Sequence, residues 1–259
     1  MCRWLNIPRS SYYYQAVDPV SEADLEDKIT YIFLESKSRC GARKIKKCLE
    51  KDGIILSRRR IRRIMKRLNL VSVYQKAAFK PHSRGKNEAP IPNRLDRQFD
   101  QKRPLEALVT DLTYVRVDRR WAYVCLTIDF FNREIIGLTV GWHKTAELVK
   151  QAIQSIPYAL TKAKLFHSDR GKEFDNQLID EMLEAFGITR SLSQAGCPYD
   201  NAVAESTYRS FKLEFINQET FQSLKELALK TKDYVHWWNY HRIHGSLNYQ
   251  TPMTKRIIA

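Results

Sequence analysis

Apolar residues recur at helical spacing in the first part of the chain. After Ser21, a residue type that caps helices, Leu25 and Ile29 fall on one face of a helix. A shorter helical segment is expected to precede this helix and to end near Pro19. We therefore expect residues 1–70 to form a small all-helical region.

A second helical pattern opens at Ser57, after a break at Asp52-Gly53. Its apolar residues stand at the i, i+3, i+4 and i+7 positions of one face, namely Ile61, Ile64, Met65 and Leu68. Its remaining surface is basic, with Arg58, Arg59, Arg60, Arg62, Arg63, Lys66 and Arg67. Two short helices joined by a tight turn, the second rich in arginine, predict a helix-turn-helix over about 40–70.

The charge on this helix allows two interpretations. One is a solvated cationic helix without a binding role. However, seven basic residues within ten positions repel one another and need a compensating partner, so we favour a helix that binds nucleic acid. The pattern leaves open whether the helix reads base edges or only contacts phosphates.

The pattern changes beyond residues 71–103, a polar and basic stretch with recurring Pro and Gly that we interpret as a linker. Three segments rich in β-branched and aromatic residues follow, separated by short breaks: 108–117, 121–129 and 133–142. Their spacing predicts an antiparallel meander of three strands.

Helices and strands then alternate toward the end of the chain. We expect a helix over 145–160, a strand over 163–168, a helix over 175–186, a strand over 188–193 and helices from about 200. This order predicts an α/β fold, in which a mixed sheet is covered by helices, for residues 104–259.

Charge also separates the two parts of the chain. The 259 residues carry a net charge of +15. Residues 1–103 hold 25 Lys and Arg against 11 Asp and Glu, whereas residues 104–259 hold 19 against 18. A basic front part indicates a polyanionic partner. The five cysteines lack zinc spacing, and no apolar run reaches the roughly 20 residues of a membrane span. We expect a cytoplasmic protein without structural zinc.

Three carboxylates stand where a charge needs a partner. Asp111 lies in the middle of an apolar strand, and Asp169 directly follows a short strand. Glu205 lies near the start of a helix that Asp200 or Asn201 would cap. If the three carboxylates converge, hard cations must neutralise them, and oxygen-only ligands favour Mg²⁺ or Mn²⁺. Two such ions could activate a hydroxyl and stabilise the leaving oxygen in a phosphodiester displacement.

Two cations follow Glu205 on the same face of its helix. Arg209 and Lys212 stand four and seven residues after it. This face would suit a phosphate backbone that enters a metal site, but an ordinary Glu–Arg surface pair has the same spacing. From the spacing alone, the surface pair is the favoured interpretation.

Several segments resemble the catalytic core shared by retroviral integrases and bacterial insertion-sequence transposases. They are most similar to the family three type, whose second reading frame encodes the catalytic part. The segments are TDLTYV (110–115), IDFFNREIIG (128–137), HSDRGKEF (167–174), CPYDNAVAESTYRSFKLE (197–214) and WNYHRIHGSLNYQTP (238–252). The basic stretch 40–70 resembles the helix-turn-helix that precedes this core. Between Asp169 and Glu205 lie 35 residues, the spacing typical of the family.

The resemblance implies an RNase H-like fold in which the three carboxylates form a DDE triad that holds two Mg²⁺ or Mn²⁺ ions. It implies that Lys212 contacts the end of the mobile element, and that His167 and Asn201 lie near the site. Two departures, Cys40 and Leu108 in place of the family's usual Tyr and Trp, fall at positions that we interpret as packing positions.

The implied activity is that of a DNA transposase: metal-dependent cleavage at the end of an insertion sequence, then attack of the freed 3′-OH on target DNA. The implied partners are DNA and further copies of the chain, since two ends must be joined. The upstream helix-turn-helix and leucine zipper of the family's first reading frame are not seen. We therefore expect the second-frame product, with the first-frame product as a further partner.

Two alternatives remain at this point. A hydrolytic nuclease on the same fold would cleave DNA without joining it, and the complete order of the motifs argues against it. A non-catalytic DNA-binding regulator would bind DNA without forming a metal-dependent product, and the intact triad argues against that interpretation.

Overall fold

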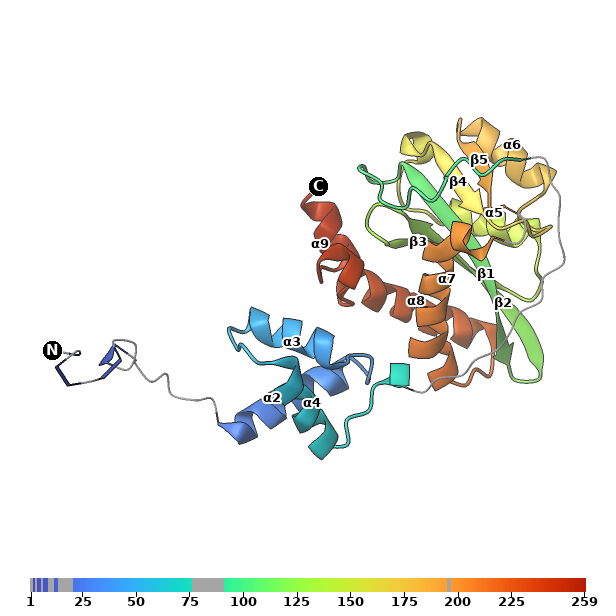
Figure 1. The fold of residues 1–259 in the computed structure, drawn as a ribbon. Helices are drawn as coiled ribbons and strands as arrows, with labels where there is room; N and C mark the ends of the chain where they lie inside the picture. Colours follow the sequence, from blue (N-terminus) through green and yellow to red (C-terminus); the bar gives the residue numbers. More distant parts are fainter. Residues whose placement is uncertain are drawn as a thin grey trace. The chain divides into compact units, whose positions relative to one another are not determined.

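The computed structural model describes residues 21–75, 91–194 and 197–259, together with positions 2, 4, 5, 7, 8, 12 and 13. The chain divides into two compact units, Met1–Gln75 and Lys76–Ala259 (Figure 1). Most of the helical segment expected before Pro19, and positions 76–90 of the expected linker, lie outside the described residues.

In residues 21–75 of the first unit, three helices pack around one apolar core. They are α2 (Glu22–Glu35), α3 (Ala42–Lys51) and α4 (Arg58–Arg67), followed by the short η1 (Val73–Gln75). Ser21 and Ser57 cap α2 and α4 as expected, since their Oγ atoms accept from the amides of Asp24 (3.0 Å) and Arg60 (3.2 Å). Leu25, Ile29, Ile45, Leu49, Ile61 and Ile64 are almost completely buried and form the centre of the core.

The second unit is built on a five-stranded mixed sheet with the order β3-β2-β1-β4-β5 (Figure 1). The strands are β1 (Ala107–Val117), β2 (Arg120–Asp129), β3 (Ile135–Gly141), β4 (Leu165–Ser168) and β5 (Thr189–Leu192). The first three form the expected antiparallel meander, and β4 and β5 add to β1 in parallel. The mixed α/β fold expected from the sequence is confirmed.

Helices cover this sheet. They are α5 (Ala146–Gln154), α6 (Gln177–Ala185), α7 (Ala202–Glu214), α8 (Leu224–Tyr240) and α9 (Pro252–Ile257), with short turns η2 (Leu160–Lys162), η3 (Pro198–Asn201), η4 (Ile216–Gln218) and η5 (Gly245–Leu247). The helix expected over 145–160 ends earlier, with Ser155 as its C-cap. Pro157 explains the difference, because the residue before a proline avoids helical backbone angles.

Two apolar cores flank the sheet, because neighbouring residues of a strand point to opposite faces. Val109 packs with Phe211 of α7 in one core, and Leu108 packs with Val149 of α5 in the other. Leu108 is fully buried and Cys40 is 8% exposed, so both departures from the family pattern occupy packing positions, as expected.

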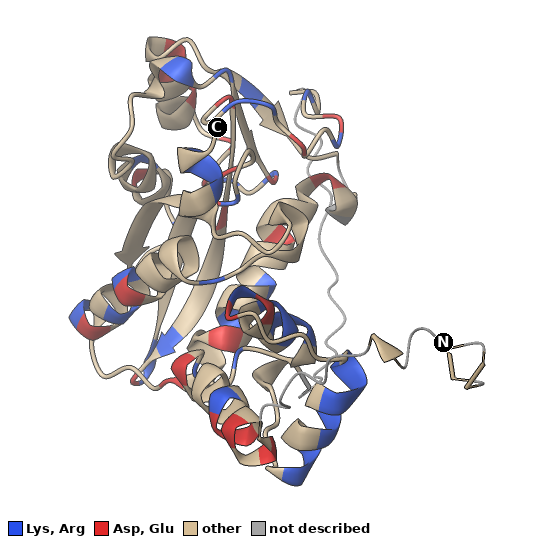
Figure 2. Ribbon diagram, turned by 90° about the vertical axis from the view of Figure 1, so that its left-hand side faces the viewer, with Lys and Arg blue, Asp and Glu red and all other residues tan. Residues whose placement is uncertain are grey.

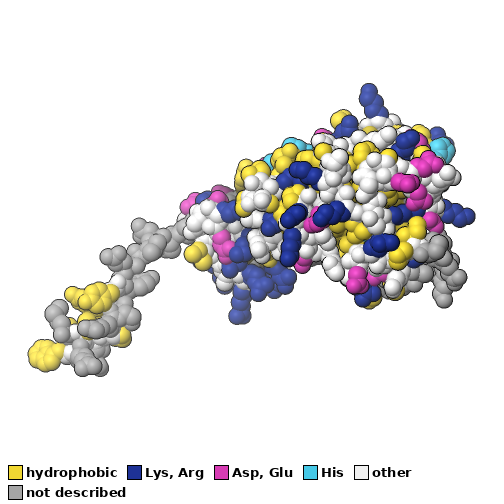
Figure 3. Space-filling model, turned by 90° about the horizontal axis from the view of Figure 1, so that it is seen from above, with side chains coloured by type: hydrophobic (Ala, Val, Ile, Leu, Met, Phe, Trp, Pro, Cys, Tyr) yellow, Lys and Arg dark blue, Asp and Glu magenta, His cyan; other side chains and the backbone are white. Residues whose placement is uncertain are grey.

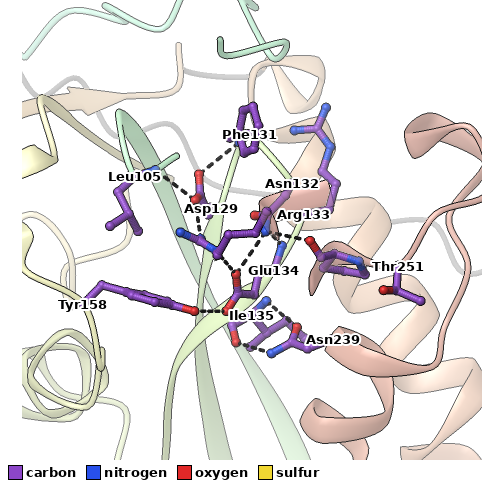
Figure 4. A network of polar contacts seen from close by, with 12 residues as sticks. Leu105, Asp129, Phe131, Asn132, Arg133, Glu134, Ile135, Tyr158, Asn239 and Thr251 are labelled. Atoms are coloured by element: carbon purple, nitrogen blue, oxygen red, sulfur yellow. Dashed lines mark hydrogen bonds and ion pairs between the residues drawn. The ribbon is translucent and has the colours of Figure 1, made fainter. Parts of the chain in front are cut away.

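A buried polar network joins α9 to the turn between β2 and β3 (Figure 4). Arg256 of α9 pairs with Asp129 (2.7 Å) and Glu134. Asn132 donates to the Glu134 carboxylate and to the carbonyl of Pro252, both at 3.0 Å. Burial raises the pKa of Asp129, and the charge of Arg256 opposes this shift. The network therefore fixes the last helix on the sheet.

A second buried pair connects α7 to the segment after α8. Glu214 is 1% exposed and accepts hydrogen bonds from the Arg242 guanidinium at 3.0 and 3.1 Å. The Tyr234 hydroxyl donates to the same carboxylate at 2.8 Å. Arg242 also lies over the Trp238 ring, 4.2 Å from its centroid. These contacts hold the C-terminal end of α7 against α8.

Within the described residues, every helix is too short or too polar to cross a bilayer.

Candidate active site and nucleic-acid interface

Asp111 and Asp169 lie at corresponding positions of the neighbouring strands β1 and β4. Val109 pairs with His167 in the parallel ladder, and Asp111 and Asp169 each follow by two positions. Asp111 is half-buried in the middle of β1, and Asp169 is half-buried directly after β4. Each carboxylate accepts one local amide, from Leu112 at 2.7 Å and from Gly171 at 2.9 Å. The topology thus brings two of the three expected carboxylates to one level of the sheet.

Helix α7, which carries Glu205, is bonded to β1 at Asp111. Three residues after Glu205, the Tyr208 hydroxyl donates to the carbonyl of Asp111 and accepts from the amide of Leu126 (2.7 Å). Burial raises the pKa of Tyr208, and the charges of Asp111 and Asp169 raise it further. Tyr208 therefore lies close to both aspartates and links the first turns of α7 to them. The Glu205 side chain itself is exposed.

Of the two cations expected beside Glu205, Lys212 lies near Asp111. Its ammonium is 4.9 Å from the centroid of the Tyr114 ring. Burial lowers the pKa of Lys212, and the nearby charge of Asp111 opposes that shift. Arg209 is exposed on α7. Lys212 is thus positioned to place a positive charge beside Asp111.

His167 is a buried member of the β4–β5 pair. Ser191 Oγ accepts the amides of Arg94 and Leu95, so its own proton is available to His167 Nδ1 at 2.9 Å. This arrangement leaves the imidazole proton on Nε2, which lies 3.1 Å from Ser193 Oγ. Burial lowers the pKa of His167 to about 4. His167 is therefore neutral at physiological pH and joins the strand before Asp169 to β5.

The capping of α7 differs from the expectation. Asn201 occupies the N-cap position but makes no side-chain capping bond, and its buried Oδ1 has no hydrogen-bond partner among the described residues. Asp200 is 1% exposed and accepts from the amide of Gln194 (2.9 Å) and from Arg97 Nε (2.8 Å). Burial would raise the pKa of Asp200, but these bonds lower it. Asp200 therefore fixes the approach to α7 rather than capping it.

The donor chemistry of the three carboxylates suits a hard divalent cation, because they offer only oxygen ligands. Asp111 and Asp169 stand at the same level of the sheet, and Glu205 is exposed on α7. Within 21–75, 91–194 and 197–259, no three His, Cys, Asp or Glu side chains are grouped closely enough to hold a metal ion. Asp111 and Asp169 thus stand on adjacent strands, and Glu205 lies one helical turn before Tyr208, whose hydroxyl is bonded to Asp111.

The basic helix of the first unit divides into sides with different partners. The ribbon of α4 is mostly blue in Figure 2, and Lys and Arg side chains gather on this unit in Figure 3. Arg60 pairs with Glu22 of α2 at 2.6 Å, and Arg67 pairs with Glu22 (3.0 Å) and Glu26. Both arginines lower the pKa of Glu22 through these hydrogen bonds. Two of the seven cations, Arg60 and Arg67, therefore pair with carboxylates of α2 among the described residues.

Two contacts near the candidate site could not be predicted from the sequence. Tyr208 lies on the buried face of its helix, so its position is typical of an ordinary core residue. The one available indication is that it stands one helical turn after Glu205. The Arg97–Asp200 pair joins residues 103 positions apart, so no local pattern indicates it.

Family models match both units. An HTH-like domain matches residues 20–78, and two models of the integrase core domain match residues 101–198 and 186–252. The chain is 29% identical over 261 residues to the InsK protein of insertion sequence element IS150 from Escherichia coli (strain K12). That alignment covers 99% of this chain and 92% of its relative. The chain thus combines an HTH-like domain with an integrase core domain, and it is similar over nearly its whole length to insertion-sequence transposases.

Two further relatives align over about nine tenths of their own length. The transposase for insertion sequence element IS904 from Lactococcus lactis subsp. lactis (strain IL1403) is 29% identical, over 88% of this chain and 91% of its own. The transposase InsF for insertion sequence IS3A from Escherichia coli (strain K12) is 27% identical, over 96% and 91%. Among solved structures, the HTLV-2 integrase catalytic core domain in complex with magnesium (trimeric form) covers 59% of this chain and 97% of its own, at 15% identity and a TM-score of 0.45.

Proposed function

We propose that this protein is a DNA transposase that cleaves the end of an insertion sequence and joins it to target DNA. The observation that carries the proposal is the common level of Asp111 and Asp169 on β1 and β4, with the helix of Glu205 bonded to Asp111 through Tyr208. The similarity to transposases supports the class of reaction, and this arrangement supports the choice of Asp111, Asp169 and Glu205 as its catalytic residues.

In this proposal Asp111, Asp169 and Glu205 hold Mg²⁺ or Mn²⁺, with two ions in each site. Two bound ions would activate the attacking oxygen and stabilise the leaving oxygen of a phosphodiester. Tyr208 keeps α7 in register with β1, so that the third carboxylate stays within reach of the first two. Lys212 provides a positive charge beside Asp111 for a DNA phosphate.

The chemistry takes place in two displacements. Water attacks the phosphodiester at the element's end. A new P–O bond leaves a 5′-phosphate on the flanking DNA, and the broken P–O bond leaves a free 3′-OH on the element. That hydroxyl then attacks a target phosphodiester, so one bond forms as another breaks, and the displaced strand leaves with its own 3′-OH. No covalent bond between protein and DNA is required.

The remaining parts of the proposal concern partners. The helix-turn-helix unit binds DNA through the cations of α4 that have no partner on α2. At least two copies of the chain act together, because two ends are joined in one event. The product of an upstream first reading frame is proposed as a further partner in recognising the ends.

The test is a strand-transfer assay on a labelled duplex that carries the terminal sequence of the element, nicked beforehand at the 3′ end. Mg²⁺, Mn²⁺ and EDTA are compared. Longer, joined products that require metal are the expected result. Shortened products alone would identify a hydrolytic nuclease, and DNA binding without any product would identify a binding protein.

The site assignment is tested in the same assay with Asp169→Asn. The variant removes one negative donor, and we expect joined products to disappear while DNA binding remains. Asp233→Asn is the matched control, because Asp233 is exposed on α8 outside the proposed site. An Asp169→Asn protein that joins DNA like the wild type contradicts the assignment.

A further inference from the structure

A pocket of about 800 Å³ opens between α3 and α4 in the helix-turn-helix unit. Five of its lining residues are cations: Arg39, Arg43, Lys44, Arg62 and Lys66. No Asp or Glu is among the described residues that line it. The pocket therefore concentrates positive charge with no acidic group in its wall, as an anion-binding site requires.

Uncharged donors complete the lining. Ser72 also lines the pocket, is only 3% exposed, and its Oγ has no hydrogen-bond partner among the described residues. A buried hydroxyl of this kind is costly unless a ligand or water satisfies it. Gly41 and Ala42 bring the start of α3 to the same wall, and the first turn of α3 contains no acidic residue. The first amides of a helix lack intrahelical acceptors and favour anions.

The two flanks of α4 differ in what they face. Positions 62 and 66 are four apart and share the flank that lines the pocket, whereas positions 60 and 67 are seven apart and share the flank toward α2. Arg60 and Arg67 are engaged by α2 carboxylates. Within the part of the chain that the structure describes, Arg62 and Lys66 form no ion pair. The pocket flank of α4 thus has positive charge to offer a ligand, unlike the flank toward α2.

We propose that the α3–α4 pocket binds a phosphate of the DNA backbone. The inference rests on the proposed function and deepens it, since it assigns the contact to a phosphate and to one flank of α4. A phosphate contact fixes how the unit lies on the duplex without reading its sequence. The pocket therefore contributes equally to binding of element ends and of unrelated DNA, and its contribution falls as salt rises.

The test compares two double variants of the full chain. Arg62→Gln with Lys66→Gln removes two charges from the pocket, and Arg60→Gln with Arg67→Gln removes two charges from the other flank of the same helix. Binding to fluorescent duplexes of end sequence and of unrelated sequence is measured over a range of salt, after circular dichroism has shown that each variant is folded.

We expect the pocket variant to lose affinity about tenfold or more for both duplexes, with a salt dependence shallower by about one unit of the log–log slope. The control variant is expected to lose less than about threefold. Equal losses of DNA affinity in the two variants would show that α4 attracts DNA only through its total charge, which would overturn the proposal. An unchanged pocket variant overturns it as well.

Two further experiments are needed. The first distinguishes binding of a DNA phosphate from binding of free phosphate, and the second distinguishes a failure of the pocket proposal from a failure of the proposed function. Inorganic phosphate is titrated at constant ionic strength. If it binds the pocket without displacing DNA, the site takes free phosphate and the proposal fails. Strand transfer is measured in parallel: a wild type that joins no DNA refutes the proposed function, while the binding comparison still decides the role of the pocket.

Discussion

The Tyr208 hydroxyl donates to the main-chain carbonyl of Asp111 and accepts the amide of Leu126 on the adjacent strand. One side chain of α7 is therefore bonded to both β1 and β2 beside a proposed catalytic carboxylate. Since Glu205 lies one helical turn earlier, this bond sets where the third carboxylate stands relative to the first.

Replacing Tyr208 with Phe tests this relationship. The change leaves a buried carbonyl and a buried amide without the hydroxyl, which costs about 1–3 kcal/mol of stability. We expect strand transfer to fall about tenfold or more, because small displacements of catalytic groups have large effects on rate. DNA binding should stay within about twofold. Tyr234→Phe is the control, since it deletes another buried hydroxyl, bonded to Glu214. Equal activity losses in both variants would reduce Tyr208 to a stability role.

Protonation of His167 is expected to make the fold sensitive to mild acid. Its pKa is lowered to about 4 by burial, against 6.5 for the free side chain. The unfolded chain therefore binds a proton between these values that the folded chain excludes. Stability is complete above about pH 6.5 and falls as the pH drops toward 4, by about 2 kcal/mol at pH 5.

The measurement is urea unfolding at pH 7 and pH 5 for the wild type and for His167→Gln, which has no titrating ring. The variant should lose less stability than the wild type between the two pH values. His143→Gln, at an exposed position, should behave like the wild type. The same pH dependence in all three proteins would contradict the assignment to His167.

The buried Glu214–Arg242 pair should be far more sensitive to mutation than surface pairs. Glu214→Gln leaves the Arg242 guanidinium buried without its counter-charge, and we expect a loss of about 3–5 kcal/mol in the free energy of unfolding. Glu219→Gln removes one carboxylate from the partly exposed Lys230 cluster and should cost less than about 1 kcal/mol. Chemical unfolding of both variants measures the difference, and similar losses would refute the expectation.

Arg256→Gln tests how far the buried network of Figure 4 stabilises the fold, and how that contribution depends on pH. It leaves Asp129 and Glu134 buried near each other without their cation. We expect a loss of about 3–5 kcal/mol at pH 7. Because burial already raises the pKa of Asp129, part of the loss should be recovered on mild acidification, as that carboxyl takes up a proton. Thermal unfolding at two pH values checks the result, and a loss that does not depend on pH would contradict it.

Much of the fold could be predicted because it depends on local patterns. The caps at Ser21 and Ser57 and the meander from residue 107 onward follow from residue type and periodicity. The shared level of Asp111 and Asp169 also follows, once two strands pair in parallel and each aspartate stands just beyond the pairing.

The remaining contacts could not be predicted because they join residues far apart in the sequence. Seven cations on α4 look equivalent in the sequence, and only the packing of α2 engages Arg60 and Arg67. Likewise, nothing near Glu214 indicates that its cation is Arg242, 28 residues away. Which charges remain available to a ligand is therefore a property of the tertiary structure.

The position of Arg256 has a consequence for synthesis on the ribosome. The turn that holds Asp129 and Glu134 is translated more than a hundred residues before the cation that neutralises them, since 127 and 122 positions separate them from Arg256. Until Arg256 has left the exit tunnel, closing the core would bury two carboxylates together, which is unfavourable. This unit therefore completes its folding only after Arg256 has been translated, and a chain cut short before this helix lacks the residue that makes the closed core stable.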